Sequence, residues 1–141
     1  MDLEFLQHAL ENDDNLCIVN TNIQEIKAKK NDILQQLGIN RNDLKTFNSK
    51  LKEYRYIENV KELKYGAAIR FINLNKLDDI KLNNTLFLCD IKILDKGIAL
   101  VLRTFNNRFI TIYLNENLVF QKISDEEKII LKAINYLKKE T

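Results

Sequence analysis

Apolar residues in the first part of the chain recur with the spacing of a helix. Between Leu16 and Leu37 they follow one another at alternating intervals of three and four, which is the a/d seam of a coiled coil. Lys30 interrupts the seam, and a polar residue at such a position can fix register and oligomeric state. β-Branched residues weaken the first turns, so a start near Asn20 or Thr21 is an alternative. The seam consists of Leu16, Val19, Ile23, Ile26, Lys30, Ile33 and Leu37.

A second helical pattern follows Gly38. Asn40 and Asp43 resemble a capping box that begins a helix, and apolar residues continue at intervals of 3-4-3. Because the connection between the two patterns is short, residues 14–55 are predicted to form an antiparallel helical hairpin. The alternative is an oligomeric coiled coil, because each helix has only one narrow apolar seam. The second helix carries Leu44, Phe47, Leu51 and Tyr54, and a shorter helix expected before residue 14 carries Leu3, Leu6 and Leu10.

From residue 65 onward the pattern becomes that of β-strands. Short segments rich in β-branched and aromatic residues are separated by turns such as Asp95-Lys96-Gly97 and Asn106-Asn107. Asn106-Asn107 fits a type I′ turn, because Asn tolerates positive φ. We expect five strands in an antiparallel meander that closes into a small barrel of the SH3-like or Sm-like kind. The expected strands are residues 67–74, 85–94, 98–104, 108–114 and 118–123.

The chain ends in the pattern of an amphipathic helix. Ser124 and Glu127 form a capping box, and Ile129, Ile130 and Ile134 begin a wide apolar stripe. We expect this helix to lie across one mouth or face of the sheet. The predicted fold class is therefore α+β, with a helical oligomerisation region over residues 1–60 and a barrel with its terminal helix over residues 61–141.

Composition and charge narrow the function only slightly. Hydrophobic residues make up 45% of the 141 residues, which is enough for a core and too much for a disordered chain. The net charge is +2, but residues 1–24 carry five acids and no Lys or Arg, whereas residues 27–64 carry ten basic residues against five acids. These two parts can pair between chains, or the basic part can face phosphate, or both are solvated helix faces.

Catalysis finds little support in the residues available. There is one His and there are two cysteines, Cys17 and Cys89, which cannot supply the usual zinc ligands. Both cysteines stand in apolar surroundings, so we expect buried, reduced thiols and an intracellular compartment. No Gly-rich phosphate loop, signal peptide or membrane-spanning run is evident. We therefore predict no catalytic residue, no metal, no cofactor, no small-molecule substrate and no membrane partner.

The strands offer a better case for binding. Alternation assigns one face to the core and leaves basic and aromatic side chains on the other, an arrangement that suits single-stranded nucleic acid. The alternative is that the terminal helix or the hairpin covers Phe109 and Tyr113. The expected core residues are Ile69, Phe71, Phe87, Cys89, Ile91, Ile93, Ile110, Ile112, Leu118 and Phe120. The candidate nucleic-acid-binding residues are Arg70, Lys92, Arg103 and Arg108 for phosphates and Phe109 and Tyr113 for bases.

Four short segments carry a resemblance to known proteins. They are Tyr54-Arg55-Tyr56-Ile57, Leu63-Lys64-Tyr65-Gly66-Ala67-Ala68-Ile69-Arg70-Phe71-Ile72-Asn73-Leu74, Cys89-Asp90-Ile91-Lys92 and Phe120-Gln121-Lys122-Ile123. On these segments, roughly residues 40–137 resemble a small protein family of giant, mimivirus-like nucleocytoplasmic large DNA viruses. The resemblance implies a viral protein that works in the host cytoplasm, in a virus factory or inside the particle. It assigns no active residue.

Two functions from different classes are therefore predicted. The first is a non-enzymatic nucleic-acid-binding module that uses the basic and aromatic barrel face. The second is a structural or protein-interaction subunit that assembles through the seam between residues 14 and 37, most simply as a two-fold dimer. The near-neutral net charge disfavours strong duplex binding.

Overall fold

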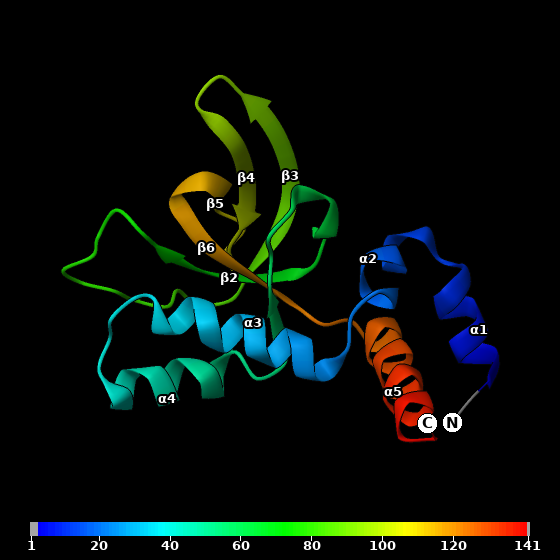
Figure 1. Ribbon diagram of the computed structural model, residues 1–141. Coiled ribbons are helices and arrows are strands. Elements are labelled where there is room, and N and C mark those ends of the chain that lie inside the picture. The colour runs from blue at the N-terminus through cyan, green and yellow to red at the C-terminus, as the bar shows by residue number, and fades with distance from the viewer. Residues whose placement is uncertain (1–2, 141) are drawn as a thin grey trace.

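The computed structural model describes the backbone of residues 3–140 and the side chains of residues 3–137. This part of the chain forms five α-helices and one six-stranded antiparallel sheet, so the expected α+β class is confirmed (Figure 1). The helices are α1 (Leu3–Glu11), α2 (Leu16–Val19), α3 (Ile23–Gln35), α4 (Arg41–Lys50) and α5 (Asp125–Glu140). The strands are β1 (Tyr54–Tyr56), β2 (Ala68–Asn73), β3 (Leu86–Leu94), β4 (Gly97–Arg103), β5 (Phe109–Tyr113) and β6 (Asn117–Lys122).

The sheet has the order β1-β6-β2-β3-β4-β5. Strands β2 to β5 form the predicted meander, and β6 returns to pair with β2 on one side and with β1 on the other. Both predicted turns lie at the expected places. Leu94 pairs with Gly97 across Asp95-Lys96. Asn107 adopts the left-handed conformation (φ 59°) but Asn106 does not, so this turn is not the type I′ turn that the sequence predicts. All five expected strands therefore exist, at bounds that differ by a residue or two.

The sixth strand, β1, differs from the sequence-based expectation. The spacing predicts Tyr54 within the second helix, but that helix ends at Lys50, and the Tyr54 N–H donates to Leu51 O at 2.9 Å to close a turn. The residues Tyr54 to Tyr56 then pair with β6, which buries Tyr54 and Arg55. Helical spacing alone does not exclude a strand when the residues are aromatic, because such residues favour a pleated, half-buried surface.

Residues 14–37 do not form one continuous helix, and the alternative start near Asn20 or Thr21 agrees with the structure, in which α3 begins at Ile23. Helices α3 and α4 form the predicted hairpin over residues 23–50 rather than 14–55. The chain turns at residues 20–22, and Asn22 begins α3 by accepting a hydrogen bond from the Glu25 N–H at 2.9 Å. Helices α3 and α4 run antiparallel below the sheet (Figure 1). Their apolar side chains, such as Leu34 of α3 and Phe47 of α4, pack against the face formed by β1, β6 and β2. Phe120 of β6 is buried in this contact.

The residues of the predicted oligomer seam have different environments. Ile26 packs in a cluster with α5, and Ile33 and Leu37 pack in the cluster beneath the sheet. Lys30 is only 5% exposed because its ammonium donates to Leu51 O at 2.7 Å and to Tyr54 O at 2.9 Å. Ile23 is half-buried, and Leu16 and Val19 are exposed. The dimer stays a prediction, but most of its proposed interface is used inside one chain.

Helix α5 does not lie across the sheet, which corrects the expectation for its docking. The capping box is present, with the Ser124 N–H on Glu127 Oε1 at 2.9 Å and the Glu127 N–H on Ser124 Oγ at 3.1 Å. The apolar stripe, however, packs against α1 and α2, beside the sheet (Figure 1). The two parts of the chain that the sequence separates at residue 60 thus contact each other in two places: β1 joins the sheet, and α5 packs against the N-terminal helices.

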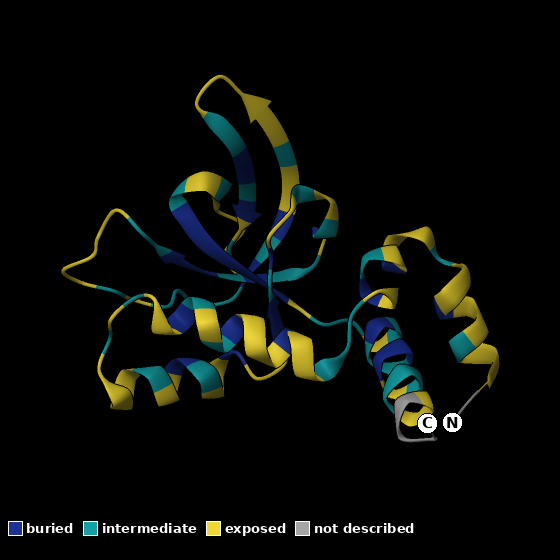
Figure 2. Cartoon of the chain, in the orientation of Figure 1, coloured by how far each residue is buried: buried dark blue, intermediate teal, exposed yellow. Residues whose placement is uncertain are grey.

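A β-bulge in β3 changes which of its residues reach the core. Leu88 pairs with Leu102 and Asp90 with Val101, so Cys89 is the extra residue. The expected inward positions Phe87 and Cys89 are therefore wrong: Leu86 and Leu88 are buried, Phe87 is half-buried and Cys89 is exposed. The outer part of the β3–β4 hairpin also exposes Ile93, which alternation predicts in the core (Figure 2).

Of the other residues predicted in the core, most are buried but Ile110 is not. Ile69, Phe71 and Ile112 are buried in the main cluster, where Ile91 packs against them, whereas Ile110 is 38% exposed. Leu118 and Phe120 are buried on the opposite side of β6 from Val119, against α3 and α4. Neither cysteine is buried, since Cys17 is half-buried and Cys89 is exposed, and both thiols are free.

Candidate functional site

An uncovered group of aromatic and basic side chains lies at one end of strands β3, β4 and β5. The register places Arg103 directly between Phe87 and Phe109 on neighbouring strands, so the three side chains share one face of the sheet. Phe105 follows in the β4–β5 turn, and Arg108 begins the return. We call this surface the Arg103 face; it consists of Phe87, Arg103, Phe105 and Phe109. Arg108 is exposed at the edge of this surface, because it aligns with Thr104 and strand alternation directs it away from the side of Phe109.

Contacts within the Arg103 face hold its side chains in place. The Arg103 guanidinium lies 5.6 Å from the centre of the Phe87 ring, and its Nη1 donates to Asn107 Oδ1 at 3.1 Å. Phe105 meets Phe87 edge to face at 5.3 Å. Even so, Phe105 is 75% exposed and Phe109 is 62% exposed. Large rings that are this exposed and held beside a fixed guanidinium have the arrangement of a binding surface rather than of a core.

The β4–β5 turn explains why the rings face water. Asn107 takes the left-handed conformation, and the turn is closed by the Asn107 N–H on Thr104 O at 3.1 Å. The Arg108 N–H then donates to the Thr104 hydroxyl, also at 3.1 Å. This short turn places Phe105 outside the sheet, where no neighbouring strand can cover it.

The structure brings only some of the predicted binding residues together. Arg103 and Phe109 belong to the Arg103 face, whereas Arg108 aligns with Thr104 and lies at the edge of the face. Lys92 and Tyr113 lie on the same sheet face at its other end, because both align with Ala99. The expectation that a helix covers Phe109 and Tyr113 is not met for Phe109.

Two features limit the basic surface. Asp90 aligns with Val101, so an exposed carboxylate stands between the Arg103 face and the end that carries Lys92. Lys96 lies 5.1 Å from the Tyr113 ring, which leaves this ring less open than Phe109. Arg70 is separate: it aligns with Phe120, and its Nε donates to Asn83 O at 3.1 Å.

Phe87 and Phe105 are not among the binding residues that the sequence predicts. Phe87 alternates with Cys89, and alternation places both in the core because nothing local marks the bulge. Phe105 stands outside the strands, next to Asn106-Asn107. An aromatic residue within a tight turn has no strand partner to cover it, and that signal is present in the sequence.

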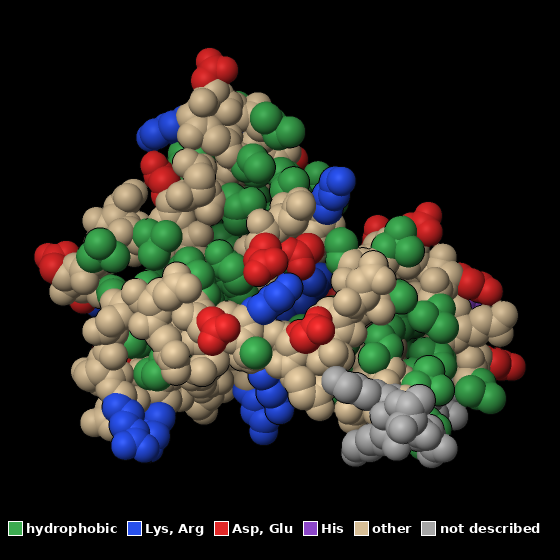
Figure 3. All heavy atoms as spheres, in the orientation of Figure 1, with side chains coloured by type: hydrophobic (Ala, Val, Ile, Leu, Met, Phe, Trp, Pro, Cys, Tyr) green, Lys and Arg blue, Asp and Glu red, His purple; other side chains and the backbone are tan. Residues whose placement is uncertain are grey.

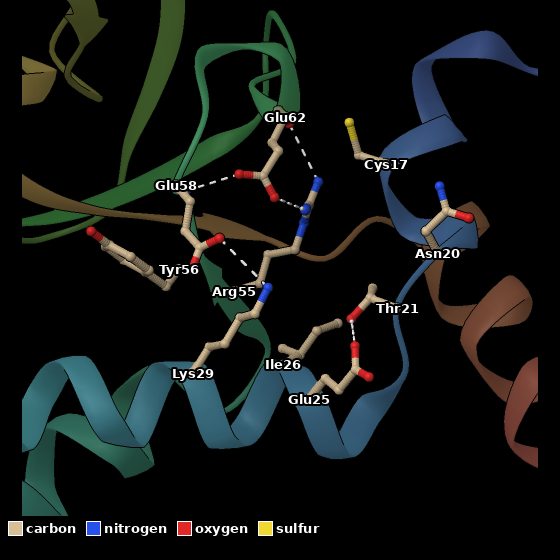
Figure 4. A pocket seen from close by; sticks show the side chains of 10 residues that line it. All are labelled: Cys17, Asn20, Thr21, Glu25, Ile26, Lys29, Arg55, Tyr56, Glu58 and Glu62. Atoms are coloured by element: carbon tan, nitrogen blue, oxygen red, sulfur yellow. Dashed lines mark hydrogen bonds and ion pairs between the residues drawn. The ribbon is translucent and has the colours of Figure 1, made fainter.

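A second polar site lies at the junction of β1, α3 and the N-terminal helices. A hollow of about 210 Å³ opens there, with acidic and basic side chains gathered over it (Figures 3 and 4). Burial raises the pKa of the Tyr56 hydroxyl, and Glu58 and Glu62 add to that shift. The lining residues are Cys17, Asn20, Thr21, Glu25, Ile26, Lys29, Arg55, Tyr56, Glu58 and Glu62.

The polar groups around this hollow mainly bind one another. Glu62 accepts from Arg55 Nη1 at 2.9 Å through one oxygen and from the Glu58 and Asn59 N–H groups through the other. Lys29 pairs with Glu58 at 3.5 Å, and Glu25 accepts from the Thr21 hydroxyl at 3.0 Å (Figure 4). A site whose charges are already paired has little left to offer a ligand. We therefore regard the Arg103 face as the better candidate.

Within the described residues, no group of three or more His, Cys, Asp or Glu side chains is arranged to hold a metal ion. Among the same residues, none of the helices has the length and apolar character needed to cross a membrane. Comparison with protein-family models, with curated proteins and with solved structures finds no match to this chain. The resemblance to a viral family accordingly stays a prediction.

Proposed function

We propose that the protein binds single-stranded nucleic acid through the Arg103 face. The observation that carries this proposal is the row of Phe87, Arg103 and Phe109 across three strands, with Phe105 beside it and two of the rings largely exposed. Unstacked bases pack on aromatic rings and guanidinium planes, while basic side chains bind the phosphates that join them.

Each residue type has a distinct task in this proposal. Phe105 and Phe109 offer their rings to successive bases, because they are the most exposed aromatic residues of the face. Arg108 is exposed and binds phosphate, and Arg103 either binds phosphate or stacks on a base from its position over Phe87. Asp90 repels phosphate beyond this end of the sheet. The binding site is therefore short, and Lys92 and Tyr113 lie on the far side of Asp90.

We further propose that the sheet is a small barrel of the SH3-like kind. Support comes from the connectivity: a four-stranded meander, β2 to β5, is followed by a single 3₁₀ turn, η3 (Leu114–Glu116), and by β6, which pairs with the first strand of the meander. Such barrels are frequent carriers of binding sites on loops and strand ends. The sheet order leaves this barrel open between β5 and β6. Proton–proton contacts in NMR spectra between β2 and β6 would support the connectivity, and their absence would contradict it.

The proposal is tested by fluorescence anisotropy with labelled DNA and RNA oligonucleotides, each as a single strand and as a duplex. We expect single strands to bind more tightly, with an affinity that falls as salt rises because counterions are released. Phe105→Ala should weaken binding by about 5- to 100-fold, since stacking contributes about 1–3 kcal/mol per base. Arg103→Ala with Arg108→Ala should reduce the salt slope by about 1.4 if Arg103 binds phosphate and by about 0.7 if it stacks on a base, because each phosphate that is no longer neutralised lowers the slope by about 0.7.

Matched controls separate the face from general charge and aromatic content. Arg41→Ala with Lys45→Ala removes the same charge from the exposed side of α4, and Tyr136→Ala removes an exposed ring from α5. Both controls should bind like the original chain. Equal losses in the control and face variants would contradict the proposal, as would the absence of binding at low salt.

A further inference from the structure

Strand β5 forms one edge of the sheet, and its outer side is uncovered. The sheet order places β5 at the end, where its neighbour in the described chain is β4. Phe109, Ile110 and Thr111 are all exposed. The opposite edge, β1, differs because α3 packs on it and Lys30 binds Tyr54 O. A long, uncovered edge is a template for a further strand.

The register shows which backbone groups of β5 point away from β4, toward the place of such a strand. The Thr104 N–H donates to Arg108 O at 2.8 Å, so these two residues form a hydrogen-bonded pair. In an antiparallel ladder hydrogen-bonded and non-hydrogen-bonded pairs alternate. Ile110 and Ile112 therefore direct their N–H and C=O groups to β4, whereas those of Phe109, Thr111 and Tyr113 point outward. Tyr113 O already accepts from Asn117 Nδ2 at 2.8 Å, so it accepts a partner strand through its second lone pair.

The sequence of β5 is complementary to itself in an antiparallel arrangement. It reads Phe-Ile-Thr-Ile-Tyr, which is symmetric about Thr111 in residue character. If two copies meet at Thr111, Phe109 lies opposite Tyr113, and Ile110 lies opposite Ile112. Aromatic and β-branched cross-strand pairs stabilise sheets, and the strand has no charge that would oppose such pairing.

We propose that two copies of the chain associate through β5 about a two-fold axis at Thr111. Thr111 of each copy exchanges backbone hydrogen bonds with Thr111 of the partner subunit, and Phe109 does so with the partner subunit's Tyr113. The outward groups identified above are the ones that such a pairing uses. A second copy is favoured over an unrelated peptide because, in an antiparallel pair of β5 strands, aromatic residues lie opposite aromatic residues and isoleucines lie opposite isoleucines.

This association has a consequence for the surface of the sheet. The pairs in contact lie on the outer face, so Phe109 of one copy stands beside the partner subunit's Tyr113. The Arg103 face then continues into the end of the partner sheet that carries Tyr113 and Lys92. The pairing itself does not depend on nucleic acid, and Thr111 is not part of the Arg103 face.

The decisive experiment places charges on the two-fold axis. Thr111→Lys sets two ammonium groups opposite each other, and Thr111→Glu sets two carboxylates there. We expect the original chain to sediment at twice the 16.6 kDa chain mass. Each variant alone should raise the dimer dissociation constant by at least about tenfold, whereas an equimolar mixture should recover the dimer through opposite charges. Ile93→Lys adds the same charge at an exposed position of β3 and should leave the dimer intact.

A chemical test reports the geometry directly. In a chain with Cys17→Ser and Cys89→Ser, Thr111→Cys should form a disulfide-linked dimer under mild oxidation, because paired residues of this type have Cα atoms about 5.5 Å apart. Ile93→Cys in the same background should remain unlinked. A monomeric original chain at high micromolar concentration would overturn the proposal. So would a mixture of the Lys and Glu variants that stays monomeric, or a dimer that is abolished by Leu16→Glu with Val19→Glu but not by Thr111→Lys.

Discussion

Glu127 connects α5 to the rest of the protein through a buried ionic cluster, so neutralising it should loosen the junction between the helices and the sheet. Its side chain is 1% exposed, and its Oε2 lies 3.2 Å from Arg55 Nη2. Its Oε1 lies 3.5 Å from Lys64 Nζ, and that ammonium also donates to Asn15 Oδ1 at 2.6 Å. Arg55 belongs to β1, Lys64 follows the 3₁₀ turn η2 (Val60–Glu62), and Asn15 precedes α2. The Glu127 carboxylate therefore connects α5 to β1 and to the segment after η2 directly, and to Asn15 through Lys64.

The substitution Glu127→Gln separates charge from shape. Glutamine has the same length and keeps an oxygen that can accept from the Ser124 N–H, so the start of α5 is preserved. Removing one partner of a buried ion pair costs about 3–5 kcal/mol when the other charge is left unpaired. Arg55 retains Glu62 at 2.9 Å, and Lys64 is partly exposed to water. We therefore expect a smaller loss, about 2–3 kcal/mol of unfolding free energy.

Urea denaturation followed by circular dichroism measures this loss, with Ser124→Ala as the matched control. That control removes a cap of about 1 kcal/mol and leaves every charge in place. A double-mutant cycle with Arg55→Met tests whether the charges act together. Each single variant removes one partner of the buried Arg55–Glu127 pair, so the double variant should lose at least about 1 kcal/mol less than the sum of the two.

Two outcomes would refute this account of the junction. A loss below about 0.5 kcal/mol for Glu127→Gln would show that the charge of Glu127 has no structural importance. Losses that add within about 0.3–0.5 kcal/mol would show that Arg55 and Glu127 stabilise the fold independently.

Two further predictions concern side chains that pack away from the sheet. Ile130 is 1% exposed between α5 and the N-terminal helices, so Ile130→Ala should lower the unfolding free energy by about 2–4 kcal/mol. Tyr136→Ala, on the exposed side of α5, should change it by less than about 0.5 kcal/mol. Equal thermal midpoints for these two variants would contradict this docking of α5. Burial, aided by Lys27, lowers the pKa of the Lys30 ammonium, so the unfolded chain binds that proton more tightly than the folded chain. Relative to that of Lys30→Met, the unfolding free energy of the original chain should therefore rise with pH between the lowered folded pKa and the ordinary value of about 10.4. Urea titrations in which the difference in unfolding free energy between the two proteins stays constant over this pH range would contradict this.

Local signals in the sequence were sufficient for the elements whose ends depend on nearby residues. Ser124 and Glu127 cap α5 by bonds across one turn, and Asn107 supplies the left-handed conformation of the β4–β5 turn. Alternating apolar residues then define strands between such turns. Capping, turn chemistry and short-range periodicity act within a few residues, so they can be recognised before the tertiary structure is known.

The tertiary structure decided where these elements pack and which of their side chains remain exposed. The stripe on α5 indicates that one side must be buried, but a sheet and a pair of helices satisfy that need equally, and α1 and α2 provide the partner. The bulge at Cys89 has no local mark because Leu86, Phe87 and Leu88 are all apolar and fit either alternation. Only pairing with β4 selects the frame that places Phe87 beside Arg103. The candidate binding surface therefore follows from strand register, which depends on residues far apart in the sequence.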